Sequence, residues 1–183
     1  MAKLSGVFAP ICTPFADDES LDLVSLRFNL ERYAASRIKG YLALGSSGEN
    51  KSLTEEEKLS VLETIIRNKG QGKVVMAGSA NFLFPAMMAG AVGGTVSIAN
   101  AFPSVALELY ECGVARDQVR GPAIQESSQR INKVISGKHG VAGVKAAMNL
   151  AGLRGGIPRR PLLPLAAEEV KALRAALVDE GLL

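Results

Sequence analysis

Short apolar runs alternate with amphipathic segments through the first hundred residues of this chain. Four runs read as strands, at residues 7–11, 41–44, 74–77 and 95–98. The run at 40–44 is apolar at nearly every position, which is typical of a parallel strand buried on both faces. Between the first two runs, apolar residues recur at the three- and four-residue spacing of a helix, at Leu23, Leu26, Leu30 and Tyr33. The pattern predicts an α/β fold.

A polar turn, Gly-Ser-Ser-Gly-Glu at residues 45–49, directly follows the second run. Thr54 and Glu57 then have the spacing of a capping box, which predicts that a helix begins there. The apolar residues predicted to share one face of that helix are Leu59, Leu62 and Ile66. The turn therefore lies at the carboxyl end of a parallel strand, where α/β barrels bind small anionic ligands. An ordinary connecting loop is the alternative interpretation.

The hydrophobic pattern of the second half of the chain predicts helices. Pro103 is expected to open a helix that continues through Tyr110 and ends at Gly113. Residues 116–135 are predicted to be helical, with Ile124, Ile131 and Ile135 on the buried side. A final helix is marked by Val170, Leu173 and Leu177. We expect two parts: residues 1–102 as a partial barrel and residues 103–183 as the last barrel helix followed by C-terminal helices.

Composition limits the functional class. Hydrophobic residues make up 48% of the 183 and charged residues 21%, which is the composition of a soluble globular protein. A net charge of +3 does not argue for a nucleic-acid partner, and the one basic cluster, at residues 154–160, lies in a Gly/Pro-rich loop. The two cysteines give neither a disulfide framework nor metal-ligand spacing, and Cys12 is expected to be a small core residue. With no long apolar span and no leader pattern, we expect a cytoplasmic protein with no membrane partner.

Several motifs resemble the dihydrodipicolinate synthase / N-acetylneuraminate lyase family of class I, pyruvate-dependent aldolases. The first is Ala-Pro-Ile-Cys-Thr-Pro-Phe at 9–15, followed by the turn at 45–49. Residues 77–100 resemble the last two barrel strands of that family, and 140–162 resemble its C-terminal helices with their connecting loop. Gly-Ser-Ala at 78–80 and the stretch 143–161 resemble the 4-hydroxy-2-oxoglutarate aldolase branch most. The resemblance implies a (β/α)8 TIM barrel with a C-terminal helical extension.

The chain is short for that fold, because a (β/α)8 barrel needs about 250 residues and four strand-like runs do not close one. The paired-tyrosine, Tyr-Asn-x-Pro and Gly-x-Lys-Asp motifs of the family's central strands do not occur. The strand at 73–78 reads equally well as the third or the seventh family strand, which places a seam between Met76 and Ala80. Roughly a hundred residues would be absent from an incomplete barrel. Three explanations are open: a middle segment that the protein has but these 183 residues omit, a true deletion or splice variant, and a designed half-barrel.

A fused strand has a physical consequence. We expect it to pair either beside the second strand or beside the last one, but not beside both, which leaves an open parallel edge. Such edges recruit other chains. A chain of this length is therefore expected to be unstable, aggregated or rescued by self-association.

The resemblance also implies the chemistry. A lysine forms a Schiff base with the ketone of a 2-oxo acid such as pyruvate, and a tyrosine shuttles protons; no cofactor or metal is needed. Ser47 would hold the substrate carboxylate, Ser46 would join the proton relay, and Gly48 and Val96 would line the same pocket. The family habitually forms dimers and tetramers, so we expect a homo-oligomer.

The lysine and the tyrosine of the family pattern are themselves missing, so whether this chain is an enzyme stays open. Lys145 imitates the lysine motif but sits in a helical stretch, and Lys73 is expected to be a solvated charge at the non-catalytic end. Lys51, near the turn, is the better substitute, and His139 is expected at the surface. Two hypotheses remain: an aldolase or lyase whose middle is missing, and an inactive deletion variant that acts only through subunit association.

Overall fold

The computed structural model describes residues 5–183, and the chain divides into two compact units at Thr95/Val96. The first unit contains the strands and the polar turn. The second consists of helices. Each is described by itself below.

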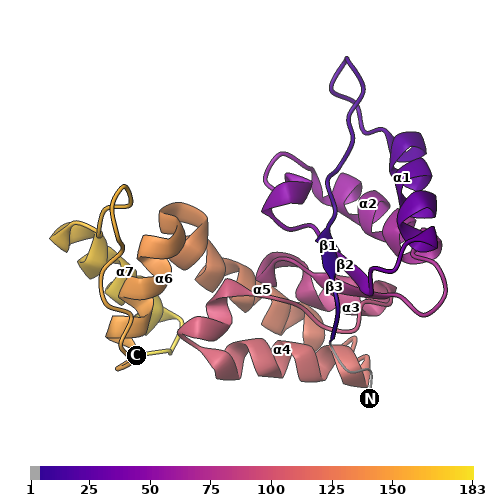
Figure 1. Cartoon of the computed structure of the whole chain (residues 1–183). Coiled ribbons are helices and arrows are strands. Elements are labelled where there is room, and N and C mark those ends of the chain that lie inside the picture. Colours follow the sequence, from indigo (N-terminus) through magenta and orange to yellow (C-terminus); the bar gives the residue numbers. More distant parts are fainter. Residues whose placement is uncertain (1–4) are drawn as a thin grey trace. The chain divides into compact units, whose positions relative to one another are not determined.

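The first unit is built on a parallel sheet (Figure 1). Its strands are β1 (Phe8–Pro10), β2 (Gly40–Ala43) and β3 (Val74–Ala77), in that order across the sheet. The register places Phe8 beside Gly40 and Gly40 beside Val74. All neighbours are parallel, so the predicted α/β class with a parallel sheet is confirmed for this unit.

The predicted strand at 95–98 is wrong. Pairing with β3 occurs slightly earlier, where Ala77 N donates to Gly93 O and Thr95 N donates to Ala77 O, each at 2.8 Å. Residues 97–100 instead form a short 3₁₀ turn, η3 (Ser97–Asn100), at the start of the second unit. Gly93 accepts a hydrogen bond from β3, and a Cβ atom on Gly94 would lie 3.0 Å from the Ala77 carbonyl oxygen, a close approach that the apolar run alone did not indicate.

The strand at the proposed seam pairs on both sides, contrary to expectation. β3 lies beside β2 along its whole length and beside the segment 92–95 on its other edge. The spatial order is therefore β1, β2, β3 and then 92–95. Four parallel segments follow one another in sequence order within this unit.

Two helices pack on each other beside the sheet, α1 (Leu23–Ala35) and α2 (Glu55–Asn68). Asp22 caps α1 by accepting hydrogen bonds from the N–H groups of Val24 and Ser25. The predicted capping box of α2 is confirmed, with Thr54 N donating to Glu57 Oε2 at 2.8 Å. The core residues of these helices are Leu26, Leu30, Val61, Leu62 and Ile65.

The predicted buried face of α2 is only partly right. Leu62 is buried, whereas Leu59 is 44% exposed. Val61 and Ile65 take its place against the core. After β3 come η2 (Ala80–Phe82) and the short α3 (Leu83–Ala89), which ends at Gly90 in a left-handed conformation.

The two faces of the sheet differ. Tyr41 and Val75 lie side by side on one face, and the Tyr41 hydroxyl donates to the Lys69 carbonyl at the end of α2, so this is the helix-covered face. Both side chains are buried. Phe8, Leu42 and Met76 belong to the opposite face and are only partly buried. In a closed α/β barrel this second face is the interior.

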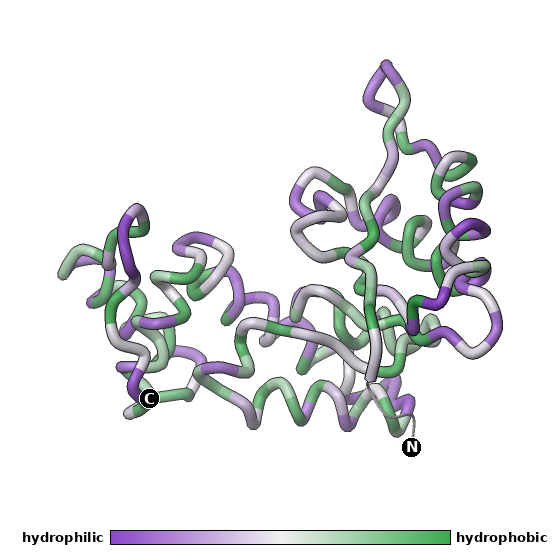
Figure 2. The backbone as a smooth tube through the Cα atoms, in the orientation of Figure 1, coloured by the Kyte–Doolittle hydropathy of each residue, from purple (hydrophilic) through white to green (hydrophobic). Residues whose placement is uncertain are grey.

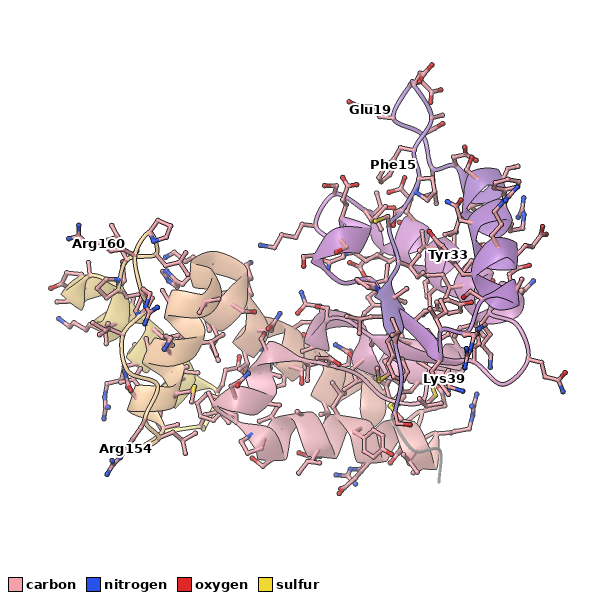
Figure 3. All side chains as sticks on the ribbon, viewed as in Figure 1. Phe15, Glu19, Tyr33, Lys39, Arg154 and Arg160 are labelled. Carbon is pink, nitrogen blue, oxygen red and sulfur yellow. The ribbon has the colours of Figure 1, made fainter. Side chains whose placement is uncertain are left out.

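The loop from β1 to α1 folds back on itself. Phe15 bridges Leu21, and Ala16 N donates to Ser20 O at 2.8 Å. Its tip is hydrophilic in Figure 2, and Figure 3 shows Glu19 at the tip, beyond Phe15. Cys12, at the start of this loop, is exposed, so the expectation of a core cysteine is wrong.

The second unit contains α4 (Pro103–Ala115), α5 (Gly121–Asn132), a π-helical turn η4 (Lys133–Gly137), α6 (Lys138–Leu150) and α7 (Ala167–Asp179). The predicted helices are present. Gly113 does not end α4, which continues to Ala115 and stops at Arg116 in a left-handed conformation. Ile131 and Ile135 are buried as predicted, and Ile124 is half-buried. Leu173 and Leu177, which mark the final helix, are also buried.

Polar contacts join the helices of this unit. The Arg130 guanidinium pairs with the Glu180 carboxylate through Nε at 2.6 Å and Nη2 at 3.2 Å, linking α5 to the end of α7. Ser97 and Ser136 both donate to Asn132 Oδ1. In Figure 3, Arg154 and Arg160 point outward from the segment between α6 and α7.

Candidate functional site

The polar turn after β2 folds as a single turn of 3₁₀ helix, η1 (Ser46–Gly48). Gly48 N donates to Gly45 O and Glu49 N donates to Ser46 O, both at 3.1 Å. The amides of Ser46 and Ser47 precede the first of these bonds, so the turn itself gives them no acceptor. Both serine side chains are exposed. Hydroxyls and backbone N–H groups thus meet at the carboxyl end of β2, as the sequence predicts.

Buried contacts hold this turn in place. Thr13, only 5% exposed, donates from Oγ1 to Gly48 O at 2.8 Å. A Cβ atom on Gly48 would lie 2.9 Å from the Ile11 carbonyl oxygen, so glycine lets the turn rest on the end of β1. On the other side, the Asn50 amide donates to Leu44 O at 2.5 Å. The turn is therefore anchored at both ends.

Two of the four non-glycine residues with a positive φ between residues 5 and 183 flank the turn. Leu44 has a φ of 56° and Glu49 a φ of 51°, both in the left-handed region. A bulky residue there is an outlier, and Leu44 is also buried. Such strain persists only where the surroundings over-determine it, and it clusters at ligand sites.

The loops after β2 and β3 touch through glycines. A Cβ atom on Gly78 would lie 2.6 Å from Gly45 Cα, and Gly78 N donates to Ala43 O at 2.7 Å. This contact brings the segment that follows β3 against the polar turn. Glycine is needed at 78 because the approach is backbone to backbone.

A small hollow of about 90 Å³ lies between these loops. It is lined by Leu44, Asn50, Lys51, Lys58, Ser79, Asn81 and Phe82. The Lys58 ammonium pairs with Glu55 at 2.6 Å and lies 5.9 Å from the centre of the Phe82 ring. Lys51, the substitute lysine suggested by the sequence, is therefore beside the turn, together with Lys58, which the sequence analysis did not single out.

The other lysines have structural contacts. Lys145 lies in α6, as its sequence context predicts, and its Nζ donates to the Gly155 carbonyl at 2.8 Å. Lys73 is not a solvated charge, because it is only 7% exposed and donates to the carbonyls of Ser36 and Ile38. Those carbonyls follow α1, at the end of the sheet where β2 begins, opposite to the turn.

Tyrosines do not approach the turn within the first unit. The Tyr41 hydroxyl is bonded to Lys69 O at 3.0 Å, and burial raises the pKa of this phenol. Tyr33 lies on the last turn of α1 (Figure 3). Both lie toward the end of the sheet where β2 begins, so neither is placed to exchange a proton with Ser46.

The remaining candidates fall in the second unit. Val96 is its first residue and precedes η3, so its place beside the turn stays a prediction. His139 lies in α6 with a side chain only 10% exposed, 3.8 Å from the Glu169 carboxylate, and is not the surface residue expected. Within residues 5–183, no three side chains of His, Cys, Asp or Glu are grouped as metal ligands. Over the same range, no helix is long and apolar enough to cross a membrane.

Thr13, Asn50 and Ser79 are site residues that sequence reasoning missed. Thr13 lies inside the motif at 9–15, which suggested a family but no role for its hydroxyl. Asn50 directly follows the polar turn, where a side-chain amide commonly bonds nearby backbone. Ser79 lies inside the Gly-Ser-Ala motif at 78–80, which suggested a branch of the family but no role for its side chain, because its position depends on the glycine contact between the two loops.

The family-model comparison decides the classification. A model described as the dihydrodipicolinate synthetase family matches residues 3–78 and again residues 63–180. The chain belongs to the dihydrodipicolinate synthetase family. The two matches overlap at 63–78, which includes β3.

Curated members of the dihydrodipicolinate synthetase family cover the chain in part. An uncharacterized DapA-like lyase of Halobacterium salinarum is 35% identical over 108 residues, which is 59% of this chain and 36% of the relative. A 4-hydroxy-tetrahydrodipicolinate synthase of Haloarcula marismortui is 33% identical over 76 residues, 42% of this chain and 25% of the relative. The corresponding enzyme of Methanothrix thermoacetophila is 40% identical over 76 residues, 42% of this chain and 26% of the relative. The chain thus spans about a quarter to a third of these relatives.

Solved structures of low sequence identity share the fold. A dihydrodipicolinate synthase aligns with 97% of this chain and 99% of its own, at 17% identity and a TM-score of 0.57. A variant of Sulfolobus solfataricus 2-keto-3-deoxygluconate aldolase aligns with 97% of this chain and 96% of its own, at 13% identity and a TM-score of 0.58. These likenesses concern the TIM-barrel fold alone.

Proposed function

We propose that the turn at Ser46–Gly48 binds the carboxylate of a 2-oxo acid such as pyruvate, and that the parent protein is a class I aldolase or lyase. The anchored 3₁₀ turn is the observation that carries this proposal. Its two exposed serines, whose amides have no acceptor within the turn, lie at the carboxyl end of a parallel strand, where barrel enzymes bind anions. Membership of a lyase and aldolase family supports the reaction class.

In this proposal Ser47 holds the carboxylate and Ser46 lies on the proton-relay side. Val96 is assigned to substrate binding by the family resemblance alone, because it is the first residue of the second unit. The Schiff base requires a lysine held as a free amine, as in any class I aldolase. The two structural lysines, Lys73 and Lys145, are engaged by backbone carbonyls.

We further propose that this lysine belongs to a segment absent from the 183 residues. One finding supports a seam at residues 76–80: the family model matches 63–78 in both of its stretches. A sequence that fuses the third and seventh strands of a barrel would have this property. The branch that acts on 4-hydroxy-2-oxo acids is favoured by the Gly-Ser-Ala motif at 78–80.

A second candidate function follows from the same seam. A chain without the Schiff-base lysine would be catalytically inactive and would act only by associating with other subunits. The open sheet of the first unit favours this candidate for the 183-residue chain.

Incubation with pyruvate and borohydride, followed by measurement of the intact mass, distinguishes an active aldolase from an inactive chain. We expect the 19.2 kDa chain to acquire no reduced adduct. We also expect pyruvate to shift the backbone amide resonances of Ser46–Gly48, and Ser47→Ala to weaken that binding about tenfold. Ser52→Ala, on an exposed serine after the turn, is the matched control.

Other outcomes have definite meanings. An adduct at 19.2 kDa would contradict the absent-lysine proposal and direct attention to Lys51 and Lys58, which line the hollow. A heavier polypeptide carrying the adduct would show that the natural product is a full aldolase. If Ser47→Ala leaves the affinity for pyruvate unchanged, the proposal that the turn binds the substrate carboxylate is wrong.

A further inference from the structure

The sheet of the first unit has two edges, and on each of them some backbone groups point away from the neighbouring strand and meet no further strand among residues 5–183. At β1, Val7 O accepts from Lys39 N at 2.8 Å and Ile11 N donates to Leu42 O at 3.0 Å. The C=O and N–H of a trans peptide point in opposite directions. The Phe8 N–H and the Pro10 carbonyl therefore point away from β2. The Pro10 nitrogen carries no hydrogen, which leaves Phe8 as the donor of β1 on this edge.

The opposite edge is formed by residues 92–95. Gly93 O accepts from Ala77 N, and Thr95 N donates to Ala77 O. By the same peptide geometry, both the N–H and the C=O of Gly94 point away from β3. Each edge of the sheet thus presents a donor and an acceptor.

We infer that two copies of this chain join through these edges and close one eight-stranded parallel barrel from two four-stranded halves. Each copy supplies four parallel segments in the order β1, β2, β3 and 92–95. A (β/α)8 barrel has eight. A two-fold axis along the barrel keeps all eight strands parallel, and it sets β1 of each copy against residues 92–95 of the other. The interface is closed and isologous.

The faces of the sheet support a second copy as the occupant. The helix-covered face is filled, with Tyr41 and Val75 at 0% and 1% exposure. Phe8, Leu42 and Met76 on the other face are apolar and partly exposed. In a barrel, this face is packed by side chains from the strands opposite. A half-barrel lacks those strands, and a second half supplies them.

This inference concerns the 183-residue chain and is independent of its chemistry, so its failure leaves the pyruvate-binding proposal standing. The first measurement is light scattering with size-exclusion chromatography across a concentration series. We expect a species of twice 19.2 kDa. A monomer at every concentration, or polydisperse open-ended assemblies, would overturn it.

Hydrogen exchange locates the interface in the wild-type chain. The Phe8 and Gly94 amides should exchange slowly in the dimer and rapidly on dilution to monomer. The Ile11 amide, bonded within the sheet, should be protected in both states. A dimer whose Phe8 and Gly94 amides exchange rapidly uses another surface and refutes the inference.

A pair of variants tests the edge directly. Phe8→Pro removes the outward donor of β1, whereas Phe8→Ile keeps it and changes only the side chain. We expect Phe8→Pro to raise the dimer Kd about a hundredfold, tenfold for each of the two edges, and Phe8→Ile to change it much less. Circular dichroism checks that both variants fold. If Phe8→Pro does not fold, the exchange measurement on the wild-type chain decides.

Discussion

The Lys73 ammonium donates a 2.7 Å hydrogen bond to the carbonyl oxygen of Ile38, across the start of two neighbouring strands. A second bond, of 2.9 Å, reaches Ser36 O, and the side chain is only 7% exposed. The carbonyls that follow α1 are thereby satisfied by a charge from the residue before β3. One side chain ties the α1–β2 loop to the strand at the proposed seam.

Replacing Lys73 tests how much its hydrogen bonds to the loop between α1 and β2 stabilise the first unit. Lys73→Met keeps the aliphatic stem and removes the donor, so two carbonyls lose a charge-assisted bond. We expect the free energy of unfolding of the first unit to fall by about 2–3 kcal/mol, measured by urea denaturation. Arg37→Met, on an exposed residue of the same loop, should change it by less than about 0.5 kcal/mol. Equal losses of stability in the two variants would contradict a stabilising role for the Lys73 hydrogen bonds.

The contact between Gly78 and Gly45 makes an asymmetric prediction. Gly78→Ala places a Cβ atom 2.6 Å from Gly45 Cα, so the backbone of one loop must move, and we expect a loss of about 1–3 kcal/mol. The Cβ atom of Gly45→Ala would lie in ordinary contact with the Leu42 side chain, 3.6 Å from Cδ2, and Gly45 has a φ of −77°, so this change should be tolerated. Thermal denaturation of both variants gives the comparison. Equal destabilisation would mean that the two loops do not meet as described.

Much of the first unit follows from local pattern. The strand at 74–77 and the helices α1 and α2 were predictable because apolar period and capping residues act within a few positions. The polar turn was predictable because it lies between a buried strand and a capping box. These features depend on neighbours in sequence.

What escaped prediction depends on distant neighbours. Leu59 has helical spacing with Leu62, but the buried face of α2 is formed by Val61, Leu62 and Ile65, and Leu59 lies outside it. Lys73 looks solvated in sequence, because the carbonyls it binds belong to a loop 35 and 37 residues away. Cys12 follows an apolar run yet lies past the end of β1, in the exposed start of a loop.

Cysteine reactivity checks the placement of that loop. Cys12 is exposed, whereas Cys112 is 3% exposed in α4. An aromatic disulfide reagent should modify one thiol rapidly in the folded chain and the second only on unfolding. Cys12→Ser should abolish the fast phase and Cys112→Ala should preserve it. Two fast thiols in the folded chain would contradict the burial of Cys112.

Thr13 links stability to ligand binding. Its hydroxyl donates to Gly48 O at 2.8 Å from a buried position, so Thr13→Val, which preserves the shape, leaves that carbonyl without its donor. We expect a loss of about 1–2 kcal/mol in the free energy of unfolding and weaker pyruvate binding, because the turn loses an anchor. Thr95→Val, on an exposed threonine, is the control for the chemical change. Destabilisation without any effect on binding would separate the turn from the carboxylate site.

The Arg130–Glu180 pair predicts an acid-sensitive second unit. The hydrogen bond from Arg130, aided by one from Ser127, holds the pKa of the Glu180 carboxyl below its ordinary value of 4.5. A carboxyl whose pKa is depressed by folding contributes stability above its unfolded pKa, and that contribution is lost as the pH falls through the folded pKa. Unfolding of the second unit should therefore become easier below about pH 4.5.

Glu180→Gln should lower the free energy of unfolding at neutral pH and flatten its dependence on acid pH, measured by urea denaturation at several pH values. Glu168→Gln, at the exposed start of α7, should leave the profile unchanged. An identical acid profile in Glu180→Gln and the wild-type chain would show that the pair does not hold the end of α7.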